Sequence, residues 1–176
     1  MDPNDTTLQD ALDADVWETV ERRLLTKMLE EFSYEGIVTP RKVAAGEDRA
    51  TYRFDLDGAT YRFEATERLL DSLHVHGDTV ERRADGDWAS LDDPLRLLRD
   101  LGASDATDLD GLTEGNLVRE YKRTLLADAH IEARARDRDG FDPLDLDYAG
   151  LEGEMAGHPW ITYNKGRLGW GYDDYR

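Results

Sequence analysis

The stretch "ATYRFDLDGATYRFEA", residues 50–65, decides the fold class of this chain. Apolar side chains alternate with polar ones on both sides of Asp57-Gly58, a pattern typical of strands that bury one face. The alternating apolar residues are Tyr52, Phe54 and Leu56 before this dipeptide and Tyr61, Phe63 and Ala65 after it. An Asp-Gly pair between two such runs is typical of a two-residue type I′ turn. The stretch therefore predicts an antiparallel β-hairpin.

The residues around the hairpin extend the predicted sheet. Residues 37–45 predict a strand at the sheet edge, because Pro40 lacks the N–H that a central strand would need. Downstream, "SLHVHGDTVERRA", residues 72–84, predicts one or two further strands that turn at Gly77-Asp78. We therefore expect a small antiparallel sheet in the middle of the chain.

Helical spacing of apolar residues occurs on both sides of this sheet. The predicted helices cover residues 8–32, 91–101, 113–138 and 144–156. Asp5, Thr6 or Thr7 caps the first of them, and Gly36 ends it. The apolar stripe of the long helix consists of Leu117, Tyr121, Leu125, Ala129 and Ile131. The order of helix, antiparallel sheet and helices predicts an α+β fold.

The composition is strongly acidic. The chain has 176 residues, with 40 Asp and Glu against 22 Lys and Arg, and a formal net charge of −18. This charge argues against binding to nucleic acid or to an anionic membrane, because both would be repelled. The acids are spread along the whole chain and Arg far outnumbers Lys, which favours adaptation to high salt (a halophilic protein) over a local acidic interaction surface.

Two absences in the sequence exclude further classes of protein. Without cysteine, the chain has no disulfide, no thiolate nucleophile and no Cys-based metal site. No apolar run approaches the ~20 residues that span a membrane, and residues 1–10 lack the features of a signal peptide. We therefore expect a cytoplasmic protein with no membrane partner.

The stretch "GHPWITYNKGRLG", residues 157–169, differs from its acidic surroundings. No acid occurs between Met155 and Tyr172. His158, Lys165 and Arg167 provide nitrogen donors suited to phosphate or carboxylate oxygens. The glycines that permit close backbone approach are Gly157, Gly166 and Gly169. From the residues alone, an anion site and a solvated loop with ordinary charges both stay open.

Three other candidates favour ordinary structural roles. His74 and His76 share one face of a predicted strand and could chelate a metal, but exposed strand histidines are the more common case. His130 is interpreted as a surface or partly packed histidine of the long helix. Residues 137–147, "DRDGFDPLDLD", lack the Gly position and closing Glu of an EF-hand and are interpreted as a solvated turn. We therefore predict no metal site.

The stretch 157–169 resembles a motif of the NRPS-independent siderophore synthetases, the IucA/IucC or aerobactin-synthetase family. That motif reads G-H-P-x-H-P-x-x-K-x-R-x-G. The matching residues are Gly157, His158, Pro159, Lys165, Arg167 and Gly169. The chain departs from the motif at the second His-Pro, where it has Ile161-Thr162. Upstream, the order of helix, sheet and helices is similar to the family's N-terminal thumb region.

This resemblance implies a function and a division of the chain. Family members use ATP and Mg²⁺ to adenylate a citrate-type carboxylate, which an amine or hydroxylamine then attacks to give an amide. His158, Lys165 and Arg167 would contact the ATP phosphates. Residues 1–150 would form the thumb-like region, and residues 151–176 would begin the nucleotide-binding region.

The resemblance also implies limits. Family enzymes continue for several hundred residues beyond the motif, so we expect the chain alone to be inactive. The remaining C-terminal portion of the enzyme would then be a partner of this chain. Whether the chain forms a homo-oligomer stays open. The alternatives are a noncatalytic anion- or nucleotide-binding module, a subunit of a split enzyme, and an inactive remnant.

Overall fold

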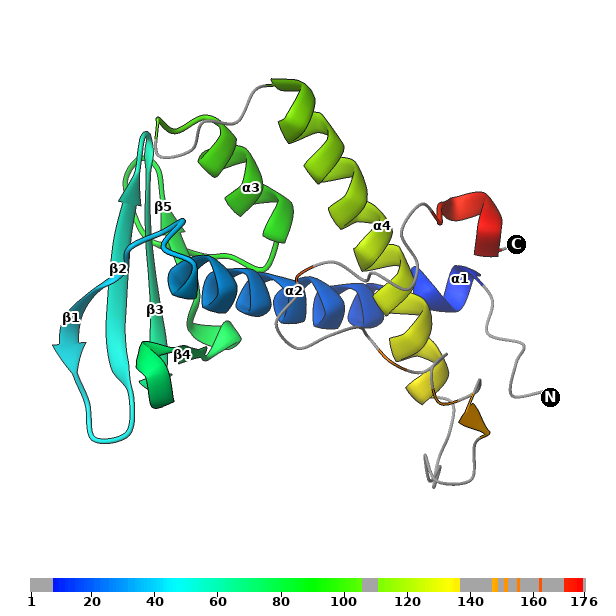
Figure 1. Ribbon diagram of the computed structural model, residues 1–176, viewed down its shortest axis with the longest axis horizontal. Coiled ribbons are helices and arrows are strands. Elements are labelled where there is room, and N and C mark those ends of the chain that lie inside the picture. The colour runs from blue at the N-terminus through cyan, green and yellow to red at the C-terminus, as the bar shows by residue number, and fades with distance from the viewer. Residues whose placement is uncertain are drawn as a thin grey trace. The chain divides into compact units, whose positions relative to one another are not determined.

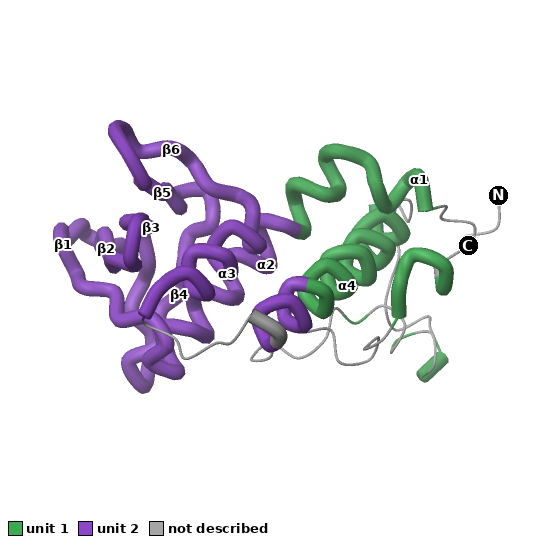
Figure 2. The backbone as a smooth tube through the Cα atoms, turned by 90° about the horizontal axis from the view of Figure 1, so that it is seen from above, with its two compact units in different colours: residues 1–20, 119–176 green, residues 21–118 purple. Residues whose placement is uncertain are grey.

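The computed structural model describes residues 8–105, 111–136, 147–148, 151, 155, 162 and 170–175. The chain divides into two compact units, shown in different colours in Figure 2. Unit 1 consists of Met1–Val20 and Arg119–Arg176, and unit 2 consists of Glu21–Val118. The fold is α+β, as the sequence predicts.

Unit 2 contains a six-stranded antiparallel sheet (Figure 1). Its strands are β1 (Arg41–Ala45), β2 (Ala50–Leu56), β3 (Ala59–Glu67), β4 (Leu73–Val75), β5 (Glu81–Arg83) and β6 (Ala89–Ser90). The order is β1-β2-β3-β5-β6, and β4 also pairs with β3. The predicted edge strand is confirmed as β1, and the short strand β6 at the other edge was not predicted.

The predicted hairpin is confirmed as β2 and β3, with Asp57 and Gly58 between them. Tyr52 lies opposite Phe63, and Phe54 lies opposite Tyr61. The rings of Phe54 and Tyr61 stack with centroids 4.9 Å apart, an arrangement in which aromatic pairs stabilise a sheet beyond their buried area. These four rings and the alanines on the same face of the two strands are buried, so this face of the sheet forms the core of unit 2.

The predicted type I′ turn is wrong at one residue. Gly58 has a φ of +84°, but Asp57 lacks the positive φ that a type I′ turn requires at both central residues. The carboxylate of Asp57 accepts hydrogen bonds from the Ser104 hydroxyl at 3.3 Å and the Asp105 N–H at 2.9 Å. Contacts with a distant segment therefore accompany this turn, and its two residues alone do not predict its type.

The predicted turn at Gly77-Asp78 does not reverse the chain. β4 and β5 both run antiparallel to β3, and both lie along the same edge of it. Val75 of β4 pairs with Ala65, whereas Arg82 of β5 pairs with Tyr61. The 3₁₀ turn at Gly77–Thr79 is therefore an interruption between two successive strands of one direction.

Two helices of unit 2 lie on one side of the sheet (Figure 1). One is the part of α2 (Ala14–Tyr34) that belongs to this unit, and the other is α3 (Pro94–Gly102). α3 begins later than predicted because Asp93 caps it, accepting from the Leu95 N–H at 2.8 Å, and Pro94 occupies the first turn. Its buried leucines are Leu95, Leu97, Leu98 and Leu101.

The predicted first helix is two helices in the structure. α1 (Leu8–Ala11) ends before Leu12, and α2 then begins after Asp13. The Asp13 carboxylate accepts a hydrogen bond from the Asp15 N–H at 3.0 Å, so it caps α2. The predicted caps at residues 5–7 lie outside the described residues. Gly36 follows the helix with a φ of +72°, as expected of a C-terminal glycine.

α4 (Gly111–Arg136) confirms the long predicted helix. Its final turn, within unit 1, contacts the start of α2: the Arg136 guanidinium donates to the Thr19 hydroxyl at 2.8 Å and to the Asp15 carbonyl at 3.2 Å. Of the helix predicted at residues 144–156, the described part shows one hydrogen bond of helical spacing, from the Leu151 N–H to the Asp147 carbonyl at 2.9 Å. A 3₁₀ turn, η5, covers Tyr172–Tyr175.

Candidate functional site

The residues predicted to bind phosphate lie outside the described residues. These are His158, Lys165 and Arg167, together with Gly157, Gly166 and Gly169. One residue between them, Thr162, is described, and it is buried, with 9% of its surface exposed. Within residues 157–169, Thr162 is therefore the residue whose contacts the structure describes.

Thr162 is hydrogen bonded to the long helix. Its hydroxyl oxygen lies 2.7 Å from the phenolic oxygen of Tyr121 on α4, and Tyr121 is only 2% exposed. Both residues belong to unit 1. Buried hydroxyls need such partners, because losing water without replacement costs free energy. The motif is thus attached at Thr162 to the middle of α4.

The same helix carries several buried polar residues. From Thr124 to Ile131 every residue of α4 is buried, including Asp128 and His130 at 8% exposure each. Tyr121, Thr124 and Asp128 follow three- and four-residue spacing, so they share one face of the helix. His130 is packed in the interior rather than at the surface. The helix that holds Thr162 thus presents polar groups in a buried setting.

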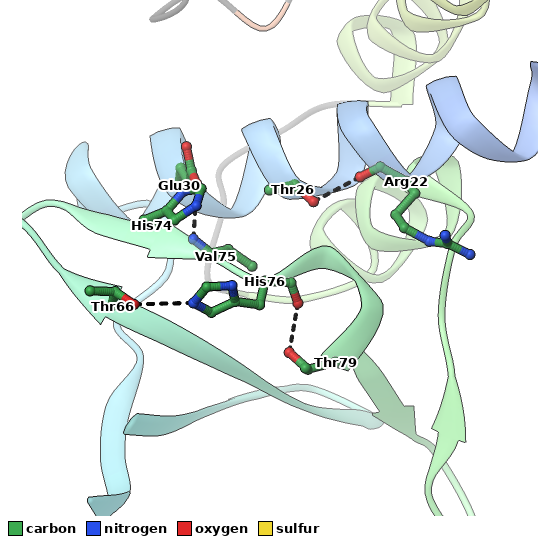
Figure 3. A network of polar contacts seen from close by, with 8 residues as sticks. All are labelled: Arg22, Thr26, Glu30, Thr66, His74, Val75, His76 and Thr79. Carbon is green, nitrogen blue, oxygen red and sulfur yellow. Dashed lines mark hydrogen bonds and ion pairs between the residues drawn. The ribbon is translucent and has the colours of Figure 1, made fainter. Parts of the chain in front are cut away.

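The two histidines of the sheet unit have structural partners (Figure 3). The Glu30 carboxylate of α2 accepts from the Val75 N–H at 2.9 Å and lies 3.1 Å from Nδ1 of His74. The Nε2 atom of His76 lies 3.1 Å from the Thr66 hydroxyl. Among the described residues, no group of three or more His, Cys, Asp and Glu side chains is arranged to hold a metal ion. These contacts connect α2 to β4 and favour a structural role.

A charged cluster under the sheet was not predicted from the sequence. Asp100 of α3 accepts from the Tyr61 hydroxyl at 2.6 Å and from Nη2 of Arg82 at 3.1 Å, and Arg96 lies 3.3 Å away. Burial alone would raise the pKa of Asp100, but the hydrogen bonds from Arg82 and Tyr61 outweigh it and lower the pKa. Burial, followed by the bond to Asp100, raises the pKa of Tyr61. The cluster joins three elements of unit 2.

A cavity of about 400 Å³ opens beside the sheet of unit 2. Among its lining residues, Arg62 provides the positive charge, while Glu64, Asp78 and Glu81 provide negative charges. Arg62 and Glu81 are already joined by two hydrogen bonds, and the first cause of the lowered Glu81 pKa is this contact. Because acids outnumber bases there, the cavity does not suit a nucleotide phosphate.

Comparisons with known proteins identify the family. No family model matches the chain. The rhizobactin siderophore biosynthesis protein RhbF of Rhizobium meliloti (strain 1021) is 37% identical over 98% of this chain and 28% of its own length. An aerobactin synthase of Escherichia coli is 32% identical over 88% of this chain and 25% of its own length. The chain belongs to the NRPS-independent siderophore synthetases, whose N-terminal portion it matches.

Solved structures agree with this family assignment. The aerobactin synthetase IucC from a hypervirulent pathotype of Klebsiella pneumoniae superposes with a TM-score of 0.73 and 28% identity, over 92% of this chain and 28% of that one. The petrobactin biosynthesis protein AsbB from Bacillus anthracis has the same fold, with a TM-score of 0.74 and 22% identity. The chain thus spans about 28% of the length of these synthetases.

Two residues of the site were not singled out from the sequence. Tyr121 was assigned to the apolar stripe of the long helix, and its burial confirms that assignment without revealing the hydroxyl contact. Thr162 was noted only as a departure from the family motif.

Every described helix is too short or too polar to span a membrane. The predicted boundary between residues 150 and 151 stays a prediction, because few residues near it are described.

Proposed function

We propose that this chain provides the phosphate-contacting motif of an ATP-dependent siderophore synthetase. The observation that carries this proposal is the occurrence of His158, Lys165 and Arg167 in an acid-free stretch of a chain whose net charge is −18. The stretch matches the family motif at six positions, and the chain belongs to that family. A protein this acidic would repel a nucleotide, so a local group of cations is the feature that permits one to bind.

The proposed reaction has two steps. First, a carboxylate oxygen of a citrate-type acid attacks the α-phosphorus of ATP, and the bond to the leaving pyrophosphate breaks. Lys165 and Arg167 stabilise the negative charge on the phosphate oxygens during this transfer. An amine or hydroxylamine then attacks the acyl carbon, the bond to AMP breaks, and an amide forms. The acid and the amine are the proposed substrates.

The residues of this chain fit the phosphates but not the metal that the family implies. A lysine point charge and a planar arginine fork are suited to phosphate oxygens. Mg²⁺ prefers carboxylate ligands, and residues 156–171 contain none. The described residues likewise contain no acidic cluster of the required kind. We therefore assign Mg²⁺ binding to the portion of the enzyme that this chain does not span.

A second candidate function is a noncatalytic anion- or nucleotide-binding module, or one subunit of a split enzyme. The observation that favours it is the acid-free stretch with His158, Lys165 and Arg167, because such a group of cations can bind an anion without catalysing a reaction. In both cases the chain would bind the phosphates of ATP. The two candidates differ in whether the chain supports catalysis when the remaining portion is present.

A chimera separates these candidates. The portion of the Rhizobium meliloti RhbF protein that aligns with this chain is replaced by residues 1–176, and pyrophosphate exchange into ATP is measured with and without citrate. Parent RhbF and the isolated chain are the controls. We expect acid-dependent exchange by the chimera and none by the isolated chain. A folded chimera without exchange, beside an active parent, contradicts the synthetase function; exchange by the isolated chain contradicts the need for a second portion.

A further inference from the structure

The turn between β3 and β4 presents two leucines to solvent. Leu69 is 90% exposed and Leu70 is 84% exposed, whereas the other large apolar side chains of the described part of the chain reach 77% at most. Single exposed apolar side chains are ordinary on protein surfaces. A neighbouring pair indicates a contact surface only where a second observation agrees with it.

The backbone of this turn is the second observation. Among the described residues, Leu70 and Asp71 are the non-glycine residues with a positive φ, at +61° and +58°. A leucine in this left-handed region costs free energy, because its Cβ atom crowds the following carbonyl oxygen. Strain of this kind persists only where the surrounding structure holds it, and it is concentrated at functional contacts.

The turn is nevertheless a defined structure. Glu67 and Leu73 form the last pair between β3 and β4. Beyond this pair, the Arg68 N–H donates to the Ser72 carbonyl at 2.7 Å, and the Ser72 hydroxyl donates to the Leu69 carbonyl at 2.9 Å. Because these bonds already order the turn, little conformational entropy is lost when a partner covers the leucines.

The charges around the two leucines are balanced. Arg68 and Asp71 flank the leucines within the turn, and the Glu67 carboxylate at the end of β3 lies 3.1 Å from the Lys42 ammonium. An apolar partner can therefore cover the leucines without burying a net charge, although the whole chain carries a net charge of −18. An apolar centre with a polar rim is the usual composition of a contact surface.

The small size of this surface decides between its possible occupants. Two separate molecules form a stable interface over about 1,200–2,000 Å², of which two leucines supply a small part. Two copies of a chain with a net charge of −18 also repel each other. A portion of the same polypeptide needs less area, because the covalent link supplies a high effective concentration. Siderophore synthetases contain such a portion, since the chain spans 28% of RhbF and 28% of IucC.

We propose that the Leu69-Leu70 turn docks into an apolar pocket on the portion of a siderophore synthetase that this chain does not span. The two leucines fill the pocket, and Arg68 and Asp71 lie at its polar rim. The inference rests on membership in the family and not on the proposed phosphate contacts, so either proposal can fail without the other.

Hydrogen–deuterium exchange tests this contact in the absence of ATP and of an acid substrate. The peptide of residues 66–74 is compared in the isolated chain and in the RhbF chimera that carries residues 1–176, and the β2–β3 peptide reports whether each protein is folded. We expect the 66–74 peptide to exchange about tenfold more slowly in the chimera, the factor by which burial of one leucine shifts an equilibrium. Equal exchange in the two proteins would overturn the proposal. Protection that rises with the concentration of the isolated chain would also overturn it, because it would identify a second copy as the occupant.

The double variant Leu69→Ser/Leu70→Asn shows whether the leucines are responsible. It removes both apolar side chains, and Asn tolerates a positive φ at position 70. In the chimera, its 66–74 peptide should exchange as fast as that of the isolated chain. Val43→Thr is the matched control, because Val43 is another exposed apolar residue of unit 2, and this variant should keep the protection. Protection that survives the double variant would contradict the role of the leucines.

Chemical denaturation of the isolated chain is a second and independent test. Replacing leucines that stabilise the fold of this chain would lower the denaturation midpoint, whereas replacing leucines that serve a partner would not. We therefore expect the double variant to unfold at the midpoint of the wild type or at a higher one, because Asn relieves the strain at position 70. A lower midpoint would show that the leucines act within this chain and would overturn the proposal.

Discussion

The cationic side chains of this chain occur in two opposite settings. In unit 2, Arg82 and Arg96 both reach the Asp100 carboxylate, and the largely buried Arg82 is thereby paired with an acid of the fold. In unit 1, Lys165 and Arg167 belong to a stretch without any acid from residue 156 to residue 171. A cation that is paired with a carboxylate of the fold has a structural role. Cations without a nearby acid in the sequence remain suited to an anionic ligand.

This comparison predicts that the largest loss of stability comes from Asp100→Asn. The substitution keeps the shape but removes the charge between Arg82 and Arg96, leaving a largely buried guanidinium without its counterion. We expect the free energy of unfolding to fall by about 3 kcal/mol, measured by chemical denaturation. Asp92→Asn is the matched control, because the Asp92–Arg22 pair is about one-third exposed and should contribute about 1 kcal/mol or less. Equal effects of the two substitutions would contradict a special role for the buried cluster.

The pH dependence of stability sharpens the same contrast. Because the pKa of Asp100 is lower in the folded state, its contribution is present above about pH 4, the ordinary carboxyl range, and is lost as the pH falls through the folded-state value. We expect the midpoint of chemical denaturation to decrease as the pH falls below about 4. This decrease should be less steep in Asp100→Asn. Identical acid profiles for the two proteins would show that Asp100 is not responsible.

A smaller loss of stability is expected at the contact between α2 and β4. Glu30→Ala leaves the Val75 N–H without its acceptor and should lower the free energy of unfolding by about 1–2 kcal/mol. Glu30→Gln keeps an oxygen that can accept this bond and should cost less. Thermal unfolding of both variants decides the point, and a Gln variant as unstable as the Ala variant would mean that the charge beside His74 matters more than the backbone bond.

The smallest effect on stability is expected in the motif. If Lys165 is used for a ligand rather than for the fold, Lys165→Ala should change the free energy of unfolding by no more than about 0.5 kcal/mol. A loss as large as that of Asp100→Asn would place Lys165 in a structural ion pair, and the contrast between the Asp100 cluster and the motif would disappear.

The sequence predicts those parts of the fold that depend on nearby residues. The β2–β3 hairpin is local, so the alternation on both sides of Asp57-Gly58 was sufficient to predict it. The path of β4 and β5 was not predictable, because both strands pair with β3 rather than with each other. The break before α2 was missed because Leu8, Leu12 and Val16 keep helical spacing across it, while the Asp13 cap ends that regularity.

The candidate site shows the same division between local and distant information. His158, Lys165 and Arg167 are recognisable because they lie close together in one acid-free stretch. Tyr121 was not recognisable as part of the site, because its contact with Thr162 spans 41 residues and its burial resembles that of any core residue. Asp100 was missed for the same reason, since its partners Tyr61 and Arg82 lie on separate strands.

The central claim is that the motif binds the phosphates of ATP in a siderophore synthetase. Its most direct test is acid-dependent pyrophosphate exchange by the RhbF chimera carrying Lys165→Ala, compared with the same chimera carrying Lys122→Ala, which changes an exposed lysine of α4. We expect a loss of about 100-fold or more for Lys165→Ala, the size expected when one stabilising donor is removed, and no loss for Lys122→Ala. Equal exchange by the two variants would contradict it.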